Sequence, residues 1–516
     1  MSVLTRRVAL LLLLALVIGA QYLHRRAPAP ADGSASADGS ADSLRRGTLL
    51  LQRCEIGRQG VAGVGTVSAY CTRFSVPEDW NAPAGRQIAL RVAIVRSAAV
   101  HSEPDPLVLL DGGPGGAATE DYPALATALA TLRERRDILL LDQRGTGGSN
   151  ALACSTNGEA GAPQSALPGS SEIAASLQRV RQCLAAVATH AAPEHYTTSD
   201  AVRDLEAIRQ ALGAPPLDLI GVSYGTRVAQ QYAAHYPGSV RSVVLDSAVP
   251  NRLALGSEHA RNLERALQSL FARCSADDPC RHSFGDSYAT LHHLRDQLRA
   301  HPQSVTLRDP LTYQPLQLEF SADDLSAIVR IDAYSVFTAA VLPLTLYQAD
   351  QGNYAPLVSQ KKWISDDLGS EITGGMELSV LCAEDADLLS SRPEDADTLL
   401  GNAQIARIRS ACSVWPRGDR PADFHQPFAS ALPVLILAGQ YDPVTPPGYA
   451  AEIVATLSNA RMLLAPGRAH SVIGAGCMPR LVRQFLDELK PRALDDRCLL
   501  QLGDIPAFVD INGPTP

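Results

Sequence analysis

The stretch LDLIGVSYGTRVAQQYAA, residues 217–234, decides how the rest of the chain is interpreted. Its first residues are mostly apolar and run into GVSYG at 221–225, after which apolar residues recur at helical spacing. The pattern predicts a buried strand, a sharp turn that carries Ser223, and a helix. A G-x-S-x-G turn of this kind lifts a serine hydroxyl off the top of a parallel sheet. The alternative is an ordinary connection between a strand and a helix, because so short a motif also arises by chance.

Short apolar runs recur on both sides of this stretch. Residues 106–110 and 138–141 have the length and composition of strands buried on both faces, and further strands are expected at 240–245 and 433–437. Helical segments lie between such runs, and the clearest is 198–212, which Gly213 closes and which Thr198 or Ser199 can cap. Alternating strands and helices predict α/β architecture with a doubly wound, mostly parallel sheet.

Two regions depart from this alternation. Residues 52–96 carry turn signals and alternate apolar with polar residues toward their end, which predicts an N-terminal antiparallel extension of the sheet. From 251 to 428 the strands stop, and helical patterns separated by prolines predict an inserted, mainly helical lid domain. We therefore expect a first core part at 47–250, the lid at 251–428 and a second core part at 429–516.

The N-terminus has the composition of a targeting signal. In residues 1–26, two arginines precede an uninterrupted apolar run that is too short for a comfortable membrane span and is typical of a secretory signal peptide. An uncleaved anchor is the alternative, because no clear A-x-A cleavage site follows, and it is the only contact with a membrane that we expect. Residues 27–46 are rich in Pro, Ala, Gly and Ser, which predicts a flexible linker. The protein is expected to be exported, either periplasmic or secreted.

The chain has an even number of cysteines, and an exported chain meets an oxidising compartment. The ten residues are Cys54, Cys71, Cys154, Cys183, Cys274, Cys280, Cys382, Cys412, Cys477 and Cys498. Disulfides are expected, although sequence cannot fix their connectivity. Pairing in chain order, which gives five short loops, is our hypothesis, and buried free thiols are the alternative.

Composition and charge exclude some partners. The net charge of −9, with no basic block long enough to follow phosphates, argues against nucleic acid. The cysteines lack the repeated C-x-x-C of a zinc site, so no metal is expected. No organic cofactor is expected either, and the sequence leaves the oligomeric state open.

A serine becomes a good nucleophile when a histidine accepts its proton and a carboxylate orients that histidine. Hydrolases with a G-x-S-x-G turn order these residues as Ser, Asp or Glu, then His, each after a strand. Asp442 follows the strand that comes after the insertion, and His470 follows the last predicted strand, near 461–464. The sequence therefore predicts Ser223, Asp442 and His470 as a catalytic triad. Asp246, which ends the strand before the insertion, is the alternative acid.

The oxyanion of an acyl-transfer intermediate needs two hydrogen-bond donors. We expect one to be the backbone N–H of Tyr224, directly after the candidate nucleophile. The other should come from Gly112 or Gly113, where the absence of side chains lets the backbone approach a substrate carbonyl. The alternatives are a plain tight turn or a nucleotide-binding loop, and the loop lacks the Lys-Ser/Thr that the second would need.

With these motifs in view, the chain resembles the prolyl and tripeptidyl aminopeptidase branch of the α/β-hydrolases, over about Arg53 to Cys498. The motifs that carry the resemblance are GGPGG at 112–116, DQRGTG at 142–147, YTT at 196–198, GVSYGT at 221–226, ACSVWP at 411–416 and the Asp442 and His470 loops. The resemblance implies the α/β-hydrolase fold and a serine exopeptidase. Prolyl members typically carry His where this chain has Asp111, which weakens a strictly proline-specific assignment.

The resemblance also implies that the lid covers the site and that lid carboxylates hold the substrate's α-amino group. In this chain Glu377, Glu384 and Asp385 are the candidates, and a solvated acidic helix face is the alternative. The expected substrates are peptides with a free N-terminus. An esterase or other acyl hydrolase of the same fold is the second interpretation. A non-catalytic binding module is disfavoured, because binding alone needs no intact triad.

Overall fold

The computed structural model describes residues 42–58, 65–154, 170–309, 312–366 and 373–514. The predicted signal segment 1–26 and most of the predicted linker lie outside these residues. The linker prediction is wrong at its C-terminal end, because Ser43–Arg46 forms strand β1 and pairs with β2 (Leu49–Ile56), which gives partners to the backbone groups that face β2. No helix within the described ranges is long and apolar enough to cross a membrane.

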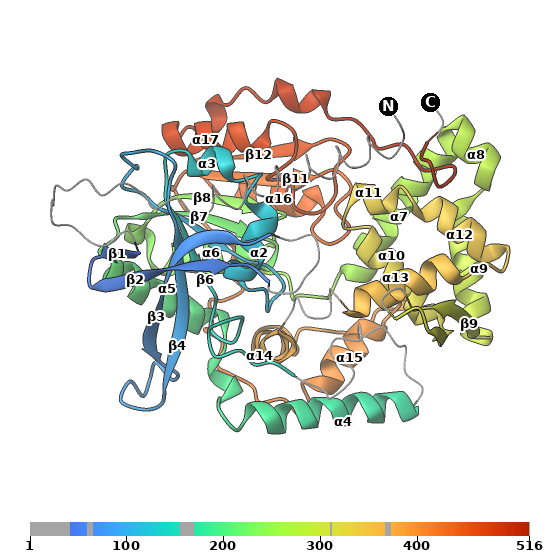
Figure 1. Ribbon diagram of the computed structural model, residues 1–516, viewed down its shortest axis with the longest axis horizontal. Coiled ribbons are helices and arrows are strands. Elements are labelled where there is room, and N and C mark those ends of the chain that lie inside the picture. Colours follow the sequence, from blue (N-terminus) through green and yellow to red (C-terminus); the bar gives the residue numbers. More distant parts are fainter. Residues whose placement is uncertain (1–41, 59–64, 155–169, 310–311, 367–372, 515–516) are drawn as a thin grey trace, which may run out of the picture. The chain divides into compact units, whose positions relative to one another are not determined.

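Ten strands of the described residues form one sheet, in the order β1-β2-β3-β4-β6-β5-β7-β8-β11-β12 (Figure 1). The strands up to β4 pair antiparallel, as does β4 with β6, and the strands from β6 to β12 run parallel. The remaining bounds are β3 (Val67–Pro77), β4 (Gln87–Val95), β5 (Leu107–Leu110), β6 (Ile138–Leu141), β7 (Leu217–Val222), β8 (Val240–Asp246), β11 (Val434–Gly439) and β12 (Ala460–Ala465). The predicted parallel sheet with its antiparallel extension is confirmed.

Strands β5, β6 and β11 are apolar throughout because helices cover both faces of the sheet. Every residue of β5, β6 and β11 is buried, and successive residues belong to opposite cores, as Ile436 and Leu437 do. One core includes residues of α4 (Ser170–Val187), α5 (Thr198–Leu212), α6 (Tyr224–His235) and α16 (Pro447–Ala455). The other includes residues of α2 (Ala118–Leu125), α3 (Ala130–Arg133) and α17 (Met478–Glu488). Thr197, one residue before the predicted positions, caps α5 by accepting the N–H of Asp200.

The predicted insertion divides in two by its packing. The first part has an apolar core of its own and contains a β-hairpin besides helices. Its elements are α7 (His259–Ala276), α8 (Asp278–Phe284), α9 (Ser287–Ala300), β9 (Gln303–Arg308), β10 (Pro315–Phe320), α10 (Ala322–Asp332), α11 (Val336–Ala339), α12 (Leu342–Asp350) and α13 (Ala355–Asp366). The second part, α14 (Gly374–Glu384) and α15 (Ala403–Ala411), shares the core of the sheet and packs against α4 (Figure 1).

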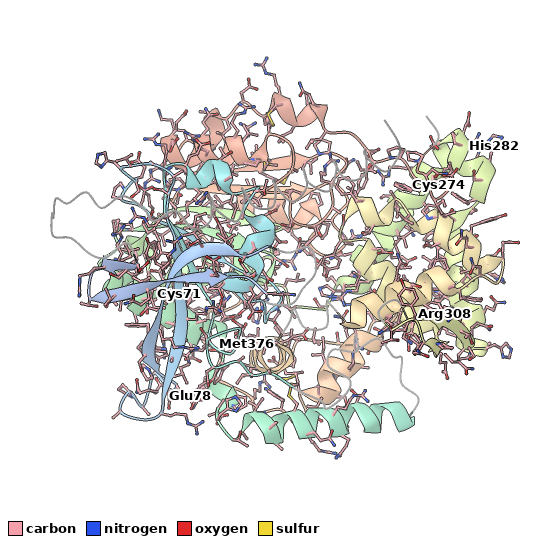
Figure 2. All side chains as sticks on the ribbon, viewed as in Figure 1. Cys71, Glu78, Cys274, His282, Arg308 and Met376 are labelled. Carbon is pink, nitrogen blue, oxygen red and sulfur yellow. A yellow bond between two sulfur atoms is a disulfide. The ribbon has the colours of Figure 1, made fainter. Side chains whose placement is uncertain are left out.

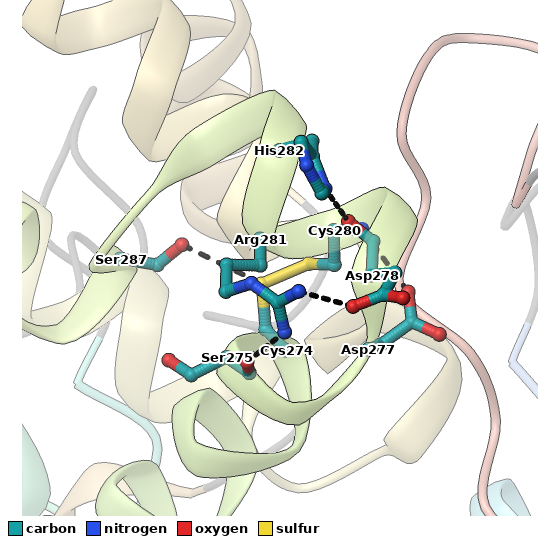
Figure 3. The surroundings of a disulfide bond; sticks show 8 residues. All are labelled: Cys274, Ser275, Asp277, Asp278, Cys280, Arg281, His282 and Ser287. Carbon is teal, nitrogen blue, oxygen red and sulfur yellow. Dashed lines mark hydrogen bonds and ion pairs between the residues drawn. A yellow bond between two sulfur atoms is a disulfide. The ribbon is translucent and has the colours of Figure 1, made fainter.

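The structure pairs all ten cysteines in chain order. The bonds are Cys54–Cys71, Cys154–Cys183, Cys274–Cys280, Cys382–Cys412 and Cys477–Cys498. Figure 2 labels Cys71 on β3 and Cys274 at the end of α7. Figure 3 shows how Cys274–Cys280 joins α7 to α8, where Asp277 caps α8 by accepting the N–H of Cys280 at 3.0 Å. Each such bond stabilises the fold by restricting the unfolded chain.

The crossing of α6 with β5 generates the first prediction. A Cβ on Gly225 would lie 2.0 Å from the carbonyl oxygen of Leu110, a backbone atom that cannot rotate away. Gly225→Ala should therefore lower the free energy of unfolding by about 3 kcal/mol or more. Gly448→Ala on α16 is the matched control, because nothing lies within 4 Å of its added Cβ. Urea titration should show a loss for the first variant alone; equal stability of both would contradict the proposed close crossing.

Candidate active site

Ser223 occupies the turn between β7 and α6. Its backbone has φ 53° and ψ −121°, a conformation that residues other than glycine rarely adopt. Glycines allow the turn, since a Cβ on Gly221 would lie only 2.5 Å from the carbonyl oxygen of Gly225. The N–H of Ser223 donates to the carbonyl oxygen of Asp246 at 2.9 Å. Ser223 Oγ has no hydrogen bond within the described part of the chain, and such bonds often tighten only when substrate binds.

Asp442 lies on the loop after β11 and is buried. Its Oδ1 accepts the N–H groups of Val444 and Thr445, at 2.9 and 2.8 Å. Its Oδ2 accepts the hydroxyl of Thr445 at 2.8 Å and lies 2.8 Å from Nδ1 of His470. The turn after Asp442 thus holds the carboxylate from one side and aims its second oxygen at the imidazole.

His470 lies on the loop after β12, with 9% of its side chain exposed. The bond to Asp442 assigns the proton to Nδ1 and leaves Nε2 as a proton acceptor. Burial disfavours the imidazolium, but Asp442 and then Asp246 raise the pKa of His470 above its ordinary value. Burial would also raise the pKa of Asp442, yet His470 and the N–H groups of the turn lower it. The pair therefore favours a charged Asp442 beside a basic imidazole.

Asp246, the alternative acid, ends β8 and is fully buried. Its carboxylate accepts the N–H groups of Val472 and Ile473, each at 2.9 Å, on the loop that follows the candidate histidine. Because its carbonyl oxygen also accepts the N–H of Ser223, Asp246 joins the nucleophile turn to the histidine loop. Burial raises its pKa to about 6. Asp442 is thus the residue that contacts the imidazole, and Asp246 holds the backbone of the loop after it.

The predicted oxyanion donors lie on two segments that meet at Ser223. A Cβ on Gly112 would lie 3.2 Å from the Cβ of Ser223, so the glycine loop after β5 runs beside the candidate nucleophile. The N–H of Gly112 already donates to Oδ1 of Asp111 at 2.8 Å. Those of Gly113 and Tyr224 have no acceptor among the described residues. Of the three predicted donors, Gly113 and Tyr224 are therefore available to a substrate.

Two of the three predicted lid carboxylates already have partners inside the protein. Glu384 accepts the N–H and the hydroxyl of Thr198, at 2.7 and 3.0 Å. Asp385 accepts a hydrogen bond at 2.8 Å from Arg227, which lies one turn after Ser223. Only 1% of Glu384 and 0% of Asp385 is exposed, and burial raises the pKa of Glu384 to about 7. The structure gives both residues a role in holding α14 to α5 and α6 and does not bring them to an accessible surface.

Glu377, the third predicted carboxylate, has different surroundings. It is half-buried in the first turn of α14, and its carboxyl group forms no hydrogen bond or ion pair with the described residues. The helix begins beside the glycine loop, because the N–H of Thr373 donates to the carbonyl oxygen of Gly115 at 3.0 Å. Burial raises the pKa of Glu377, against the opposing effect of Arg330 and Arg407. Glu377 thus presents an unpaired carboxyl group one helical turn from a contact with the glycine loop.

Two residues outside the predicted set support the site. Arg144 is buried and donates from Nε and Nη2 to Asp204 on α5, at 2.7 and 2.6 Å, which fixes the DQRGTG loop. That motif was a sequence signal, although it did not reveal the partner. Tyr334, between α10 and α11, contacts His470. Nothing in the sequence distinguishes it from the other tyrosines of the insertion.

A parallel sheet that carries a serine on a strained strand–helix turn and an aspartate–histidine pair on later loops defines the serine hydrolase class. The alpha/beta hydrolase fold family matches residues 105–474. This match covers more than half of the chain, so the protein belongs to the alpha/beta hydrolase fold family. The predicted fold class and the prediction of a serine hydrolase enzyme are confirmed.

Relatives of known name are similar over different lengths. Serine protease Hip1 of Mycobacterium tuberculosis is 25% identical over 448 residues, which cover 81% of this chain and 85% of that protein. Tripeptidyl aminopeptidase of Streptomyces coelicolor is 34% identical over 193 residues, 35% of this chain and 36% of that one. Carboxylesterase B of Mycobacterium tuberculosis is 25% identical over 461 residues, which cover 82% of this chain and 85% of that protein. The resemblance to the aminopeptidase branch is confirmed by the first two.

The two aspartates should respond differently to neutralisation. Asp442→Asn removes the negative charge beside Nδ1 and the preference for a proton on that nitrogen, and should lower kcat/KM by on the order of 10³-fold or more. Asp246→Asn loosens the histidine loop and should cost about 10- to 100-fold. Because Asp246 raises the pKa of His470, its neutralisation should also move the acid limb of the pH–rate profile to lower pH. If Asp246→Asn lowered kcat/KM severely and Asp442→Asn only mildly, Asp246 would be the catalytic acid instead of Asp442.

Proposed function

We propose that the protein is an exported serine exopeptidase, an aminopeptidase of prolyl or tripeptidyl type that hydrolyses peptide bonds near free N-termini. The observation that carries the proposal is the 2.8 Å contact between Asp442 and Nδ1 of His470, on loops tied to the Ser223 turn. The names of the relatives, serine protease and tripeptidyl aminopeptidase, favour peptides as the substrates.

The chemistry proceeds through an acyl-enzyme. Nε2 of His470 takes the proton as Ser223 Oγ attacks the peptide carbonyl, and Asp442 stabilises the imidazolium that forms. The N–H groups of Gly113 and Tyr224 bind the developing oxyanion, which is worth about 3 kcal/mol per donor at such sites. His470 then gives its proton to the leaving amine, and water repeats the sequence to release the acyl group.

Recognition of the substrate's free N-terminus is assigned to Glu377. An ammonium group is the natural partner for a half-buried carboxyl group without a protein partner, because ion pairing would offset the burial that raises its pKa. Glu384 and Asp385, which the sequence offered for the same role, are left out because Thr198 and Arg227 already occupy them. The lid at 251–428 then selects chain ends over internal bonds.

Export is the proposed localisation, periplasmic or secreted. The signal-like composition of residues 1–26 supports it, and so do the five disulfides, which persist in oxidising compartments. An uncleaved N-terminal segment would tether the protein to a membrane. N-terminal sequencing of the protein recovered from its native compartment distinguishes a cleaved from a retained segment.

An esterase is the second candidate. The relative named carboxylesterase B matches as much of the chain as Hip1 does, and one triad cleaves esters more easily than amides. The two functions differ in the substrate's amino group, which an aminopeptidase must bind and an esterase can ignore. Specificity for blocked or free N-termini therefore separates them.

A substrate panel tests the proposed function. Aminoacyl, prolyl and tripeptidyl amides with free N-termini should be hydrolysed with higher kcat/KM than their N-acetylated counterparts, and short acyl esters serve as the comparison. Ser223→Ala and His470→Ala should each lower turnover by on the order of 10³-fold or more while the fold is retained. Hydrolysis of esters alone would favour the esterase. If the turnover of Ser223→Ala or His470→Ala stays within about tenfold of the parent's, the nucleophile or the base is wrongly assigned.

Glu377→Gln tests the amino-group site. A charge-assisted hydrogen bond contributes about 1.5 to 3 kcal/mol, so kcat/KM for free N-termini should fall roughly 10- to 100-fold. N-acetylated amides and esters should hardly change. Glu394→Gln, at an exposed lid carboxylate, is the control and should leave both substrate types unaffected. Equal losses on both types in Glu377→Gln would indicate a distorted lid and remove the support for ammonium binding.

A further inference from the structure

Tyr334 lies in the short segment between α10 and α11 and contacts His470 in two ways. Its carbonyl oxygen accepts the backbone N–H of His470 at 3.1 Å. Its ring meets the imidazole edge-to-face, with 5.0 Å between the ring centroids. The hydroxyl of Tyr334 accepts a hydrogen bond from Nη2 of Arg330 on α10 at 3.4 Å. One residue of the insertion thus holds both the backbone and the ring of the candidate base.

The contacts from the sheet side leave one motion of the imidazole unrestrained. Asp442 binds Nδ1, and Asp246 binds the backbone that follows His470. The hydrogen bond from Nδ1 to Asp442 and the 3.5 Å contact of Thr445 Oγ1 with the same nitrogen hold one edge of the ring. A tilt of the ring about that edge would carry Nε2 away from the serine. An aromatic ring packed edge-to-face against the imidazole has a preferred geometry and limits this rotation.

The segment around Tyr334 is closely packed against the catalytic loops. Ala333 and Val336, on either side of it, line a cavity of about 10 Å³ together with Tyr441 and Ala469. Those last two residues directly precede the candidate acid and base. A cavity of this size holds about one water, and its lining shows that the segment around Tyr334 faces both catalytic loops. Displacing this segment would therefore disturb both loops.

We infer that Tyr334 is a positioning residue for the hydrolytic reaction: its ring fixes the plane of His470, so that the base is fully ordered only when the α10–α11 segment is docked on the catalytic loops. The inference rests on the proposed role of His470 as the general base. It extends that role by making the insertion part of the catalytic apparatus as well as a cover over it.

The test compares Tyr334→Ala with Tyr334→Phe and Phe337→Ala. Phe337 is a matched control because it is an aromatic residue of α11 that is 65% exposed. Two readouts need only the triad: turnover of a short acyl ester, and the rate at which a fluorophosphonate labels Ser223. Tyr334→Ala should lower kcat and the labelling rate about 10- to 100-fold, because small misplacements of a catalytic group have effects of this size. KM for the ester should change by less than about threefold.

The conservative variant Tyr334→Phe separates the effect of the ring from the effect of the hydroxyl group. Tyr334→Phe keeps the ring and should retain kcat within about threefold of the parent, and Phe337→Ala should match the parent. A rise in KM with unchanged kcat for Tyr334→Ala would overturn the inference, since it describes a substrate contact instead. Equal losses in Tyr334→Phe and Tyr334→Ala would also overturn it, because the Arg330 bond would then carry the effect. If Tyr334→Ala does not fold, Tyr334→Leu gives the same comparison with volume largely retained.

The same experiment separates this inference from the proposed aminopeptidase function. A parent that cleaves esters but no peptide amides would refute the aminopeptidase, while the Tyr334 comparison would still decide the inference on ester turnover and labelling. A parent in which His470→Ala keeps full ester turnover would refute both, because no base would then remain for Tyr334 to position.

Discussion

The hydrogen bonds of Asp246 join two parts of the site that lie far apart in the sequence, the nucleophile turn and the histidine loop. Its carbonyl oxygen binds the N–H of Ser223, and its carboxylate binds the backbone after His470. Burying a carboxylate is costly, and the raised pKa of Asp246 expresses that cost. The sheet order makes the arrangement possible, because β7, β8, β11 and β12 are neighbours and present their carboxyl ends at one edge. The insertion between β8 and β11 leaves this edge intact.

The core of the fold was predictable because its signals are local. A strand buried on both faces is mostly apolar, so β5, β6, β7, β8 and β11 are recognisable in the sequence. The Ser223 turn is recognisable in the sequence by its flanking glycines, and the close crossing of α6 over β5 requires Gly225. Asp442 and His470 were found because each follows a recognisable strand in a fixed order. Chain-order pairing of the cysteines needed only the assumption that nearby residues meet.

The roles of other residues depend on partners distant in the sequence, and these roles could not be predicted. Glu384 and Asp385 look like a solvated or ligand-binding acidic pair, yet Thr198 and Arg227 from α5 and α6 bury them. Asp246 ends β8 and Asp442 follows β11, and only the course of the histidine loop shows which one meets the imidazole. Tyr334 carries no motif at all. The contacts of Glu384, Asp385, Asp246 and Tyr334 that decide these roles each span well over a hundred residues, beyond the reach of periodicity and spacing.

The two-part packing of the insertion bears on how such an enzyme can diversify. Helices α14 and α15 share the core of the sheet, and the disulfide Cys382–Cys412 joins the end of α14 to α15. Substitutions in α14 or α15 would alter the packing of α6, the helix that follows Ser223, so the sequence of this part can change little. The part from α7 to α13 has a separate apolar core and can change sequence, length or pocket shape at small cost to the sheet. New substrate preferences can therefore arise by remodelling one module, provided that the few residues touching the catalytic loops are retained.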